Sequence, residues 1–170
     1  MIGTPPFEVP TGSAAIGLYA VLVMDGLELL IPQNQVHALE PGFDVQHPDA
    51  GGVGWITVAG TRSPVYCLSR DLQPLREAPA SRHICALLDS GAGLFGVLCD
   101  EVTMFEQAAH EITPLPACMG SADMPLQGLM LHGEQVLCVG SADDLLACLD
   151  NAREPVRDRG PAQLSSGGLV

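Results

Sequence analysis

YAVLVMDGLELLIP, at residues 19–32, contains two apolar runs separated by an Asp-Gly pair. Asp25 and Gly26 readily adopt the positive φ angles of a tight turn, so the runs Tyr19–Met24 and Leu27–Ile31 are predicted to pair as a β-hairpin. Pro32 closes the second run, because proline has no backbone N–H to give to a sheet. The chain is therefore predicted to begin its ordered part as β structure.

The other apolar runs predict a succession of short strands. Most of them come in pairs around a turn that contains glycine, which is typical of hairpins. The predicted elements are a strand at Val36–Leu39, a hairpin of Trp55–Val58 and Val65–Leu68 around residues 60–64, a hairpin of Ile84–Leu88 and Leu94–Cys99 around DSGAG, a strand at Val102–Phe105, and a hairpin of Leu126–Leu131 and Val136–Val139 around His132-Gly133.

One α-helix is predicted near the C-terminal end. Ser141 is a suitable N-cap, and Asp144 follows three residues later, where an acidic side chain supports a cap. A second, shorter helical turn is predicted at Ser69–Gln73, before Pro74 ends it. The apolar residues that share one face of the main helix are Ala142, Leu145, Leu146 and Leu149.

The two halves of the chain repeat each other. Leu18 and Ile84 open matching hairpins 66 residues apart, and VHALE at 36–40 and VTMFE at 102–106 have the same separation. The later hairpins also match, with Cys67 and Cys138 placed as equivalents. Short strands leave exposed edges, which closed barrels remove. The repeat therefore predicts a mainly β fold of two related β-barrels, each of about five strands.

The length of 170 residues suits one domain or two small lobes that share a core. Hydrophobic residues make up 47% and the mean hydropathy is +0.27, which favours a folded chain. Residues 1–17 and 151–170 are poor in large apolar side chains and are predicted to be flexible. The folded domain is expected at 18–150, with one lobe at about 18–75 and the other at about 82–150.

The chain carries a net charge of −13 and has no lysine. Such a surface repels phosphates, which argues against binding to nucleic acid or to anionic membranes and favours a basic partner. No apolar run reaches the length of about 20 residues that a membrane span needs, and no secretory signal is recognised. The six cysteines contain no C-x-x-C pair and mostly lie in apolar runs, which predicts free thiols and a cytoplasmic location.

The order of these segments resembles that of the CheW-like family, the coupling proteins of bacterial chemosensory arrays. The segments that carry the resemblance are YAVLVMDGLELLIP, QVHALEP, GWITVAGTRSPVYCLSRDL, RHICALLDSGAGLFGVLCDEV and PLQGLMLHGEQVLCVGSADDLL. The resemblance implies two packed SH3-like β-barrels with a C-terminal helix, no catalytic activity and no cofactor. It also implies docking to the regulatory domain of a CheA-type histidine kinase, with methyl-accepting chemoreceptors as further partners.

The sequence departs from the family pattern at two positions. The usual V-x-E-I/V reads Val36-His37-Ala38-Leu39, and the usual N-L-R-G reads Thr57-Val58-Ala59-Gly60. A glutamate and an arginine have thus both become alanine, which leaves no unpaired charge, so the fold is expected to survive. Receptor coupling through this surface is put in question, and the second lobe or the groove between the lobes is the alternative place for binding. The residues expected to contact a partner are Val36, His37, Ala38, Ile56, Val58, Ala59, Gly60 and Arg62.

Two chemical motifs have simpler structural explanations. GAGLFG at Gly91–Gly96 matches G-x-G-x-x-G, but the apolar run that follows is typical of a strand, whereas a dinucleotide site needs a helix there. His83 and Cys85 are spaced as ligands on one strand face, but a zinc site needs three or four ligands. No nucleophile motif is present. Trp55 is expected to pack in the core or between the lobes, with a contact on a binding surface as the alternative.

Three hypotheses follow, in order. The first is a cytoplasmic, non-enzymatic adaptor that docks to a CheA-type histidine kinase and also to chemoreceptor tips. The second is a divergent CheW-like protein that no longer couples receptors and serves another output such as pilus motility. The third is a binder of nucleotides or other small ligands that uses the loop at Gly91–Gly96.

Overall fold

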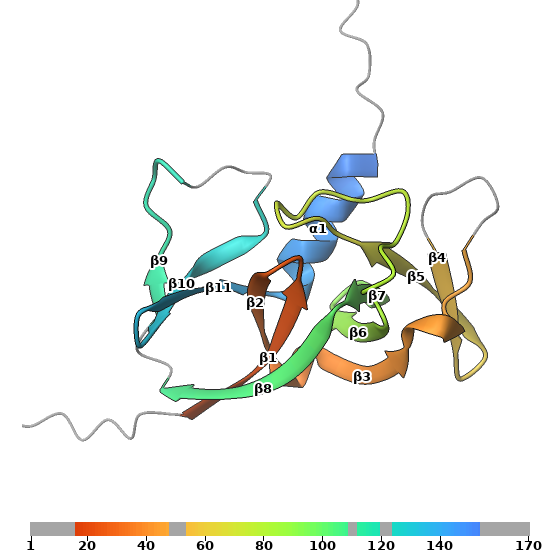
Figure 1. The fold of residues 1–170 in the computed structure, drawn as a ribbon, viewed down its shortest axis with the longest axis horizontal. Helices are drawn as coiled ribbons and strands as arrows, with labels where there is room; N and C mark the ends of the chain where they lie inside the picture. The colour runs from red at the N-terminus through yellow and green to blue at the C-terminus, as the bar shows by residue number, and fades with distance from the viewer. Residues whose placement is uncertain (1–15, 48–53, 109–111, 120–123, 154–170) are drawn as a thin grey trace, which may run out of the picture.

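The computed structural model describes residues 16–47, 54–108, 112–119 and 124–153, and the strands in these ranges form two curled sheets (Figure 1). The first has the order β8-β1-β2-β11-β10-β9 and the second β3-β6-β7-β5-β4. The first sheet contains β1 (Ile16–Met24), β2 (Leu27–Pro32), β8 (Glu101–Ala108), β9 (Ile112–Pro114), β10 (Leu126–His132) and β11 (Gln135–Gly140). The second contains β3 (Val36–Pro41), β4 (Gly54–Val58), β5 (Thr61–Cys67), β6 (Ile84–Ser90) and β7 (Gly93–Cys99).

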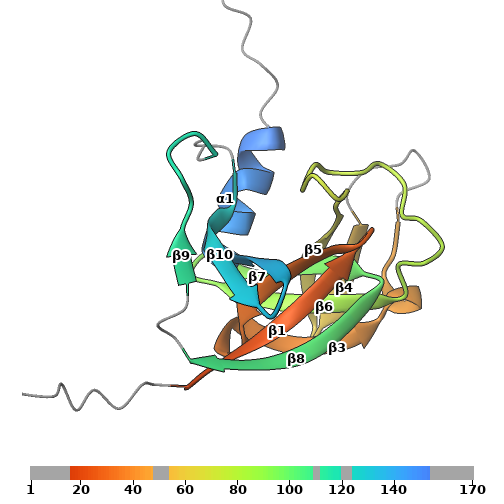
Figure 2. The same ribbon diagram turned by 60° about the vertical axis from the view of Figure 1, so that its left-hand side comes forward.

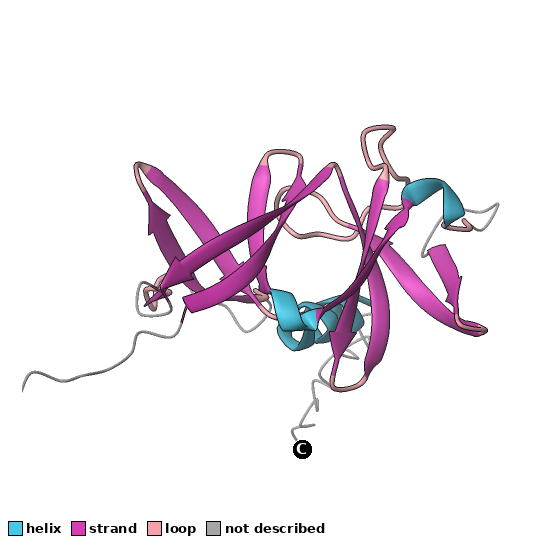
Figure 3. Ribbon diagram, turned by 90° about the horizontal axis from the view of Figure 1, so that it is seen from below, coloured by secondary structure: helices cyan, strands magenta, loops and turns pink. Residues whose placement is uncertain are grey.

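The remaining elements are two short 3-10 helices, η1 (Gln33–Gln35) and η2 (Gly42–Asp44), and the helix α1 (Ala142–Arg153). Figure 3 shows the two sheets side by side with α1 at their junction. The predicted mainly β fold of two packed barrels with a C-terminal helix is confirmed. One sheet has six strands instead of five, because the three-residue strand β9 joins β10 at its edge.

The repeat is visible in the strand pairing. Val36 of β3 lies opposite Leu88 of β6, and Val102 of β8 lies opposite Leu22 of β1, each partner displaced by 66 residues. The one parallel pair of each sheet follows the repeat as well. β5 pairs with β7 in one sheet, and β11 pairs with β2 in the other. Five strands of each sheet therefore follow the same order.

Each sheet takes its strands from both halves of the sequence. The β1–β2 hairpin pairs with strands of the second half, and the β6–β7 hairpin pairs with strands of the first half. Only Asp100 separates β7 from β8, and a single residue cannot reverse a strand, so β8 continues into the other sheet. The two sheets consequently do not coincide with the contiguous lobes expected at 18–75 and 82–150.

Several predicted boundaries need correction. The β4–β5 turn is Ala59-Gly60, where both residues have positive φ, and not residues 60–64. Because the turn lies earlier, Cys67 and Cys138 are not equivalent positions. Residues 69–73 form a hydrogen-bonded turn instead of a helix. β1 begins at Ile16 and α1 ends at Arg153, so both extend into the segments expected to be flexible, whose residues 1–15 and 154–170 lie outside the described structure.

The main core lies between the sheets and below α1. It contains buried residues of β1 and β2, of β5, β6 and β7, and the buried face of α1. Both sheets therefore contribute side chains to this core. Phe95 of β7 is fully buried there and meets Tyr66 edge to face, with ring centroids 6.2 Å apart. Each sheet also has a smaller cluster of its own. The predicted cap of α1 is confirmed, since Ser141 Oγ accepts a bond of 3.1 Å from the Asp144 N–H.

Candidate protein-interaction surface

The predicted interaction residues lie on β3, on β4, in the β4–β5 turn and, for Arg62, on β5. β3 and β4 are the two edge strands of the five-stranded sheet, and its curl brings them together, since Ala38 and Val58 pack against the same buried cluster. We call this region, from Val36 to Asp44 and from Gly54 to Arg62, the β3–β4 edge. It lies at the end of the molecule opposite β9 and β10 (Figures 1 and 3).

The eight predicted residues differ in how they meet solvent. Ile56 is buried at 4% exposure, and Val36 packs against the main core, so these two support the surface from below. His37 is exposed at an irregularity in the β3–β6 pairing. Ala38 and Val58 are half-buried, and the exposed members are His37, Ala59, Gly60 and Arg62. A role for them in binding stays a prediction.

Trp55 stands on the outside of this edge. Its ring lies under the Arg62 guanidinium at 3.9 Å, and its Nε1–H donates to Gln46 Oε1 at 2.8 Å. The expectation that Trp55 packs in the core or between the lobes is therefore wrong. β4 is an edge strand, so its outward side chain meets Arg62 and Gln46 instead of a second layer.

A pocket of about 350 Å³ opens at the β3–β4 edge. Its apolar part comes from Ile56, Val58 and Ala59, and two carboxylates, Glu40 and Asp44, stand beside it. Sequence reasoning missed these acids, because β3 and η2 meet β4 only after the sheet curls. The remaining lining residues are Gln46 and Thr57.

The turn at this edge is strained. Ala59 has a φ of 49°, a conformation that costs an L-residue with a Cβ roughly 1–2 kcal/mol. Asn-Gly is a preferred pair for such a turn. We expect Ala59→Asn to raise the free energy of unfolding by about 0.5–1 kcal/mol, measured by urea denaturation. An unchanged or lower value would show that the turn is relaxed.

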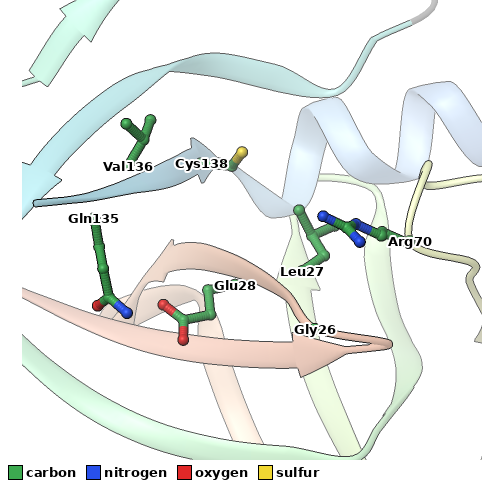
Figure 4. A pocket seen from close by; sticks show the side chains of 7 residues that line it. All are labelled: Gly26, Leu27, Glu28, Arg70, Gln135, Val136 and Cys138. Carbon is green, nitrogen blue, oxygen red and sulfur yellow. The ribbon is translucent and has the colours of Figure 1, made fainter.

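A second pocket lies where the six-stranded sheet meets the loop that follows β5 of the other sheet, and we call it the inter-sheet pocket. It has a volume of about 360 Å³ and is lined by the β1–β2 turn, by β2 and β11, and by Arg70 from that loop. In Figure 4 the side chains of Arg70 and Leu27 lie at one end, and those of Glu28 and Gln135 at the other. This inter-sheet pocket is the alternative place for a partner.

Arg82 joins the elements around that junction. Its side chain is buried and donates to the Leu68 carbonyl at 2.8 Å and to the Leu98 carbonyl at 3.3 Å. The same guanidinium lies 3.0 Å from an Asp25 carboxylate oxygen and 3.4 Å from one of Asp100. Arg82 therefore connects the ends of β5 and β7 to the β1–β2 turn and has a structural role.

The loop at Gly91–Gly96 does not have the geometry of a phosphate site. Gly91-Ala92 form the turn between β6 and β7, and β7 follows where a nucleotide site needs a helix. The Gly91 N–H already donates to Asp143 at 2.7 Å, and the Ala92 N–H to Ser90 Oγ at 3.3 Å. A carboxylate thus stands where a phosphate would have to bind.

In the described ranges no three His, Cys, Asp or Glu side chains gather in a way that could hold a metal ion. Among the same residues, no helix combines the length and the hydropathy that crossing a bilayer requires.

The thiols differ sharply in environment, and this predicts a labelling pattern. Burial, with a smaller effect of Glu40, raises the pKa of Cys85 to about 12, and burial likewise raises the pKa of Cys99 and Cys67. Cys118 is exposed. With a thiol reagent at pH 8, mapped by mass spectrometry, Cys118 should react at once and Cys85 and Cys99 only on unfolding. Prompt labelling of Cys85 in the native protein would contradict the structure.

The sequence matches no protein-family model and no curated protein. Among solved structures, the fold is similar to that of the scaffolding protein TtCheW from Thermoanaerobacter tengcongensis. The TM-score is 0.63 and the identity 15%, over 77% of this chain and 92% of that one. At this identity the similarity shows the fold alone. The resemblance inferred from the order of the sequence segments is thus confirmed at the level of the fold.

Proposed function

We propose that this chain is a non-enzymatic adaptor of a bacterial chemosensory system, working in the cytoplasm. It docks through the β3–β4 edge onto the regulatory domain of a CheA-type histidine kinase. The observation that carries the proposal is the fold, which matches almost the full length of a scaffolding protein. The exposed residues at the edge and the net charge of −13 support docking to a basic protein surface.

A divergent role without receptor coupling is the second candidate. It is favoured by Ala38 and Ala59, which stand where the resembled family has a glutamate and an arginine. Ala38 is half-buried and Ala59 is exposed, so a receptor that reads a charged pair would find neither charge here. An output other than receptor coupling, such as pilus motility, would then be served.

A paired pull-down separates the two. The full chain is immobilised and offered, in parallel, the purified regulatory domain of the CheA-type kinase and the cytoplasmic tip of a chemoreceptor from the same genome. Capture of both supports receptor coupling, and capture of the kinase domain alone supports the divergent role. Capture of neither by the correctly folded chain contradicts the proposed function.

A further inference from the structure

Glu40 occupies a position that an aromatic side chain occupies in the other sheet. Glu40 lies opposite Cys85 in the β3–β6 pair, and Phe105 lies opposite Tyr19 in the β8–β1 pair. Cys85 and Tyr19 are 66 residues apart, the period of the repeat. An irregularity in β3 near His37 shifts its register by one residue, so Glu40 and not Leu39 is the structural equivalent of Phe105.

Val58 has an equally clear counterpart. It lies opposite Thr61 across the β4–β5 turn, as His132 lies opposite Gln135 across the β10–β11 turn. The positions occupied by Glu40 and Val58 in one sheet are thus those of Phe105 and His132 in the other.

The two sheets differ in the contacts made at these equivalent positions. In the six-stranded sheet, the rings of Phe105 and His132 meet edge to face, with centroids 4.8 Å apart, and join β8 to β10. In the five-stranded sheet, Glu40 and Val58 line the pocket of about 350 Å³. The six-stranded sheet also has a pocket beside these rings, of about 190 Å³, so the five-stranded sheet lacks the ring contact and has the wider of the two pockets.

The pocket at Glu40 is acidic, and no basic side chain among the described residues lines it. Both ion pairs in the described part of the chain involve Arg82, so neither Glu40 nor Asp44 takes part in one. Arg62, on β5 of the hairpin that lines the pocket, is held over the Trp55 ring on the outer side. Within the described residues, no side chain supplies a positive charge to the two carboxylates of the pocket.

We propose that the pocket receives an arginine side chain of the docking partner, an inference that rests on the proposed function. The aliphatic part of arginine would lie on Ile56, Val58 and Ala59, and its guanidinium would face Glu40 and Asp44. Arginine suits this pocket because its planar head forms charge-assisted hydrogen bonds with carboxylates. Phe43, which precedes Asp44 in η2, is 86% exposed and offers apolar surface to the same partner.

The first test removes the charges and keeps the shape. The double variant Glu40→Gln with Asp44→Asn is titrated calorimetrically with the purified regulatory domain of the CheA-type kinase. We expect binding about tenfold weaker than for the unmodified chain, with a smaller dependence on salt. The matched control, Glu77→Gln with Asp150→Asn, removes two exposed acids elsewhere and should bind as the unmodified chain does.

The second test does not depend on the kinase. The amide signals of Thr57 and Ala59 are followed by NMR while N-acetyl-arginine amide is added, with the uncharged citrulline analogue in parallel. The arginine compound alone should shift them, and the acid-free double variant should not respond. Ala59→Arg, which places a guanidinium at the pocket wall, should also abolish the response and weaken kinase binding.

The two tests separate the two claims. If the kinase domain does not bind but the arginine compound shifts the signals, the pocket proposal stands and the proposed function fails. If the kinase domain binds equally to the chain and to the double variant, or if the arginine and citrulline compounds act alike, the pocket proposal is overturned and the proposed function stands.

Discussion

Arg82→Met should lower the free energy of unfolding by about 3–5 kcal/mol, as expected when one partner of a buried ionic group is removed. The Arg82 side chain is fully buried and serves the carbonyls of Leu68 and Leu98 together with Asp25 and Asp100. Methionine fills similar space but donates no hydrogen bond, so two buried carbonyls lose their donor.

The measurement is equilibrium urea denaturation followed by circular dichroism. Arg82→Lys is the informative comparison, since it keeps the charge but cannot reach all four groups at once, and an intermediate loss is expected. Arg76→Met is the matched control, because Arg76 is exposed and its replacement should change stability little. A loss below about 1 kcal/mol for Arg82→Met would contradict the structural role given to Arg82.

The same cluster predicts a pH dependence. Burial would raise the pKa of Asp100, but hydrogen bonds from the Ser81 side chain and the Asp25 N–H, together with Arg82, hold it below its usual value. In the unfolded chain the pKa of an aspartate is about 3.9, and in the folded chain that of Asp100 is lower, so its ionised form stabilises the fold at higher pH. This stabilisation is lost as the pH falls through the pKa of the folded state. Stability should therefore decline below about pH 4, and less steeply in Arg82→Met.

Phe95→Ala is expected to cost about 3–5 kcal/mol, because a fully buried ring is removed from a packed core. The position of Phe95 also predicts how the two sheets unfold relative to each other. Phe95 belongs to the cluster that contains residues of both sheets and of α1. The loss should therefore weaken both sheets together and leave a single unfolding transition.

This expectation is checked by following unfolding with probes on each sheet. Trp55 fluorescence reports on the five-stranded sheet, and amide exchange of β10 and β11 reports on the six-stranded sheet. In Phe95→Ala, the unfolding midpoints reported by the two probes should shift to lower urea concentrations by the same amount. Two separated transitions would show that the sheets unfold independently and that the shared core contributes little.

Local sequence signals predicted the β1–β2 hairpin well but misplaced the turn of the β4–β5 hairpin. Asp25-Gly26 has positive φ at both residues, and each half of the β1–β2 hairpin is where the apolar pattern put it. The exchange of hairpins between the halves was not predictable from such signals, because it depends on the single residue Asp100 between two strands. β9 was missed because three residues with a proline give no strand pattern, although Gly128 lets its backbone approach closely.

The candidate surface was only half visible in the sequence. Residues of β3 and β4 were identified from motif positions, and the structure brings them together at one edge. Glu40 and Asp44 could not be assigned to the same place, since the one-residue register shift in β3 and the curl of the sheet decide where they lie. The contact between Arg62 and Trp55 likewise has no signal in the sequence, because it crosses two strands on an outer face.

Hydrogen exchange of the full chain, with and without the kinase regulatory domain, tests the proposed docking most directly. Peptides that cover β3, η2 and the β4–β5 turn should exchange more slowly in the complex, while those of β2, β11 and the loop around Arg70 should be unchanged. Protection confined to this second group would place the partner at the inter-sheet pocket and contradict docking through the β3–β4 edge.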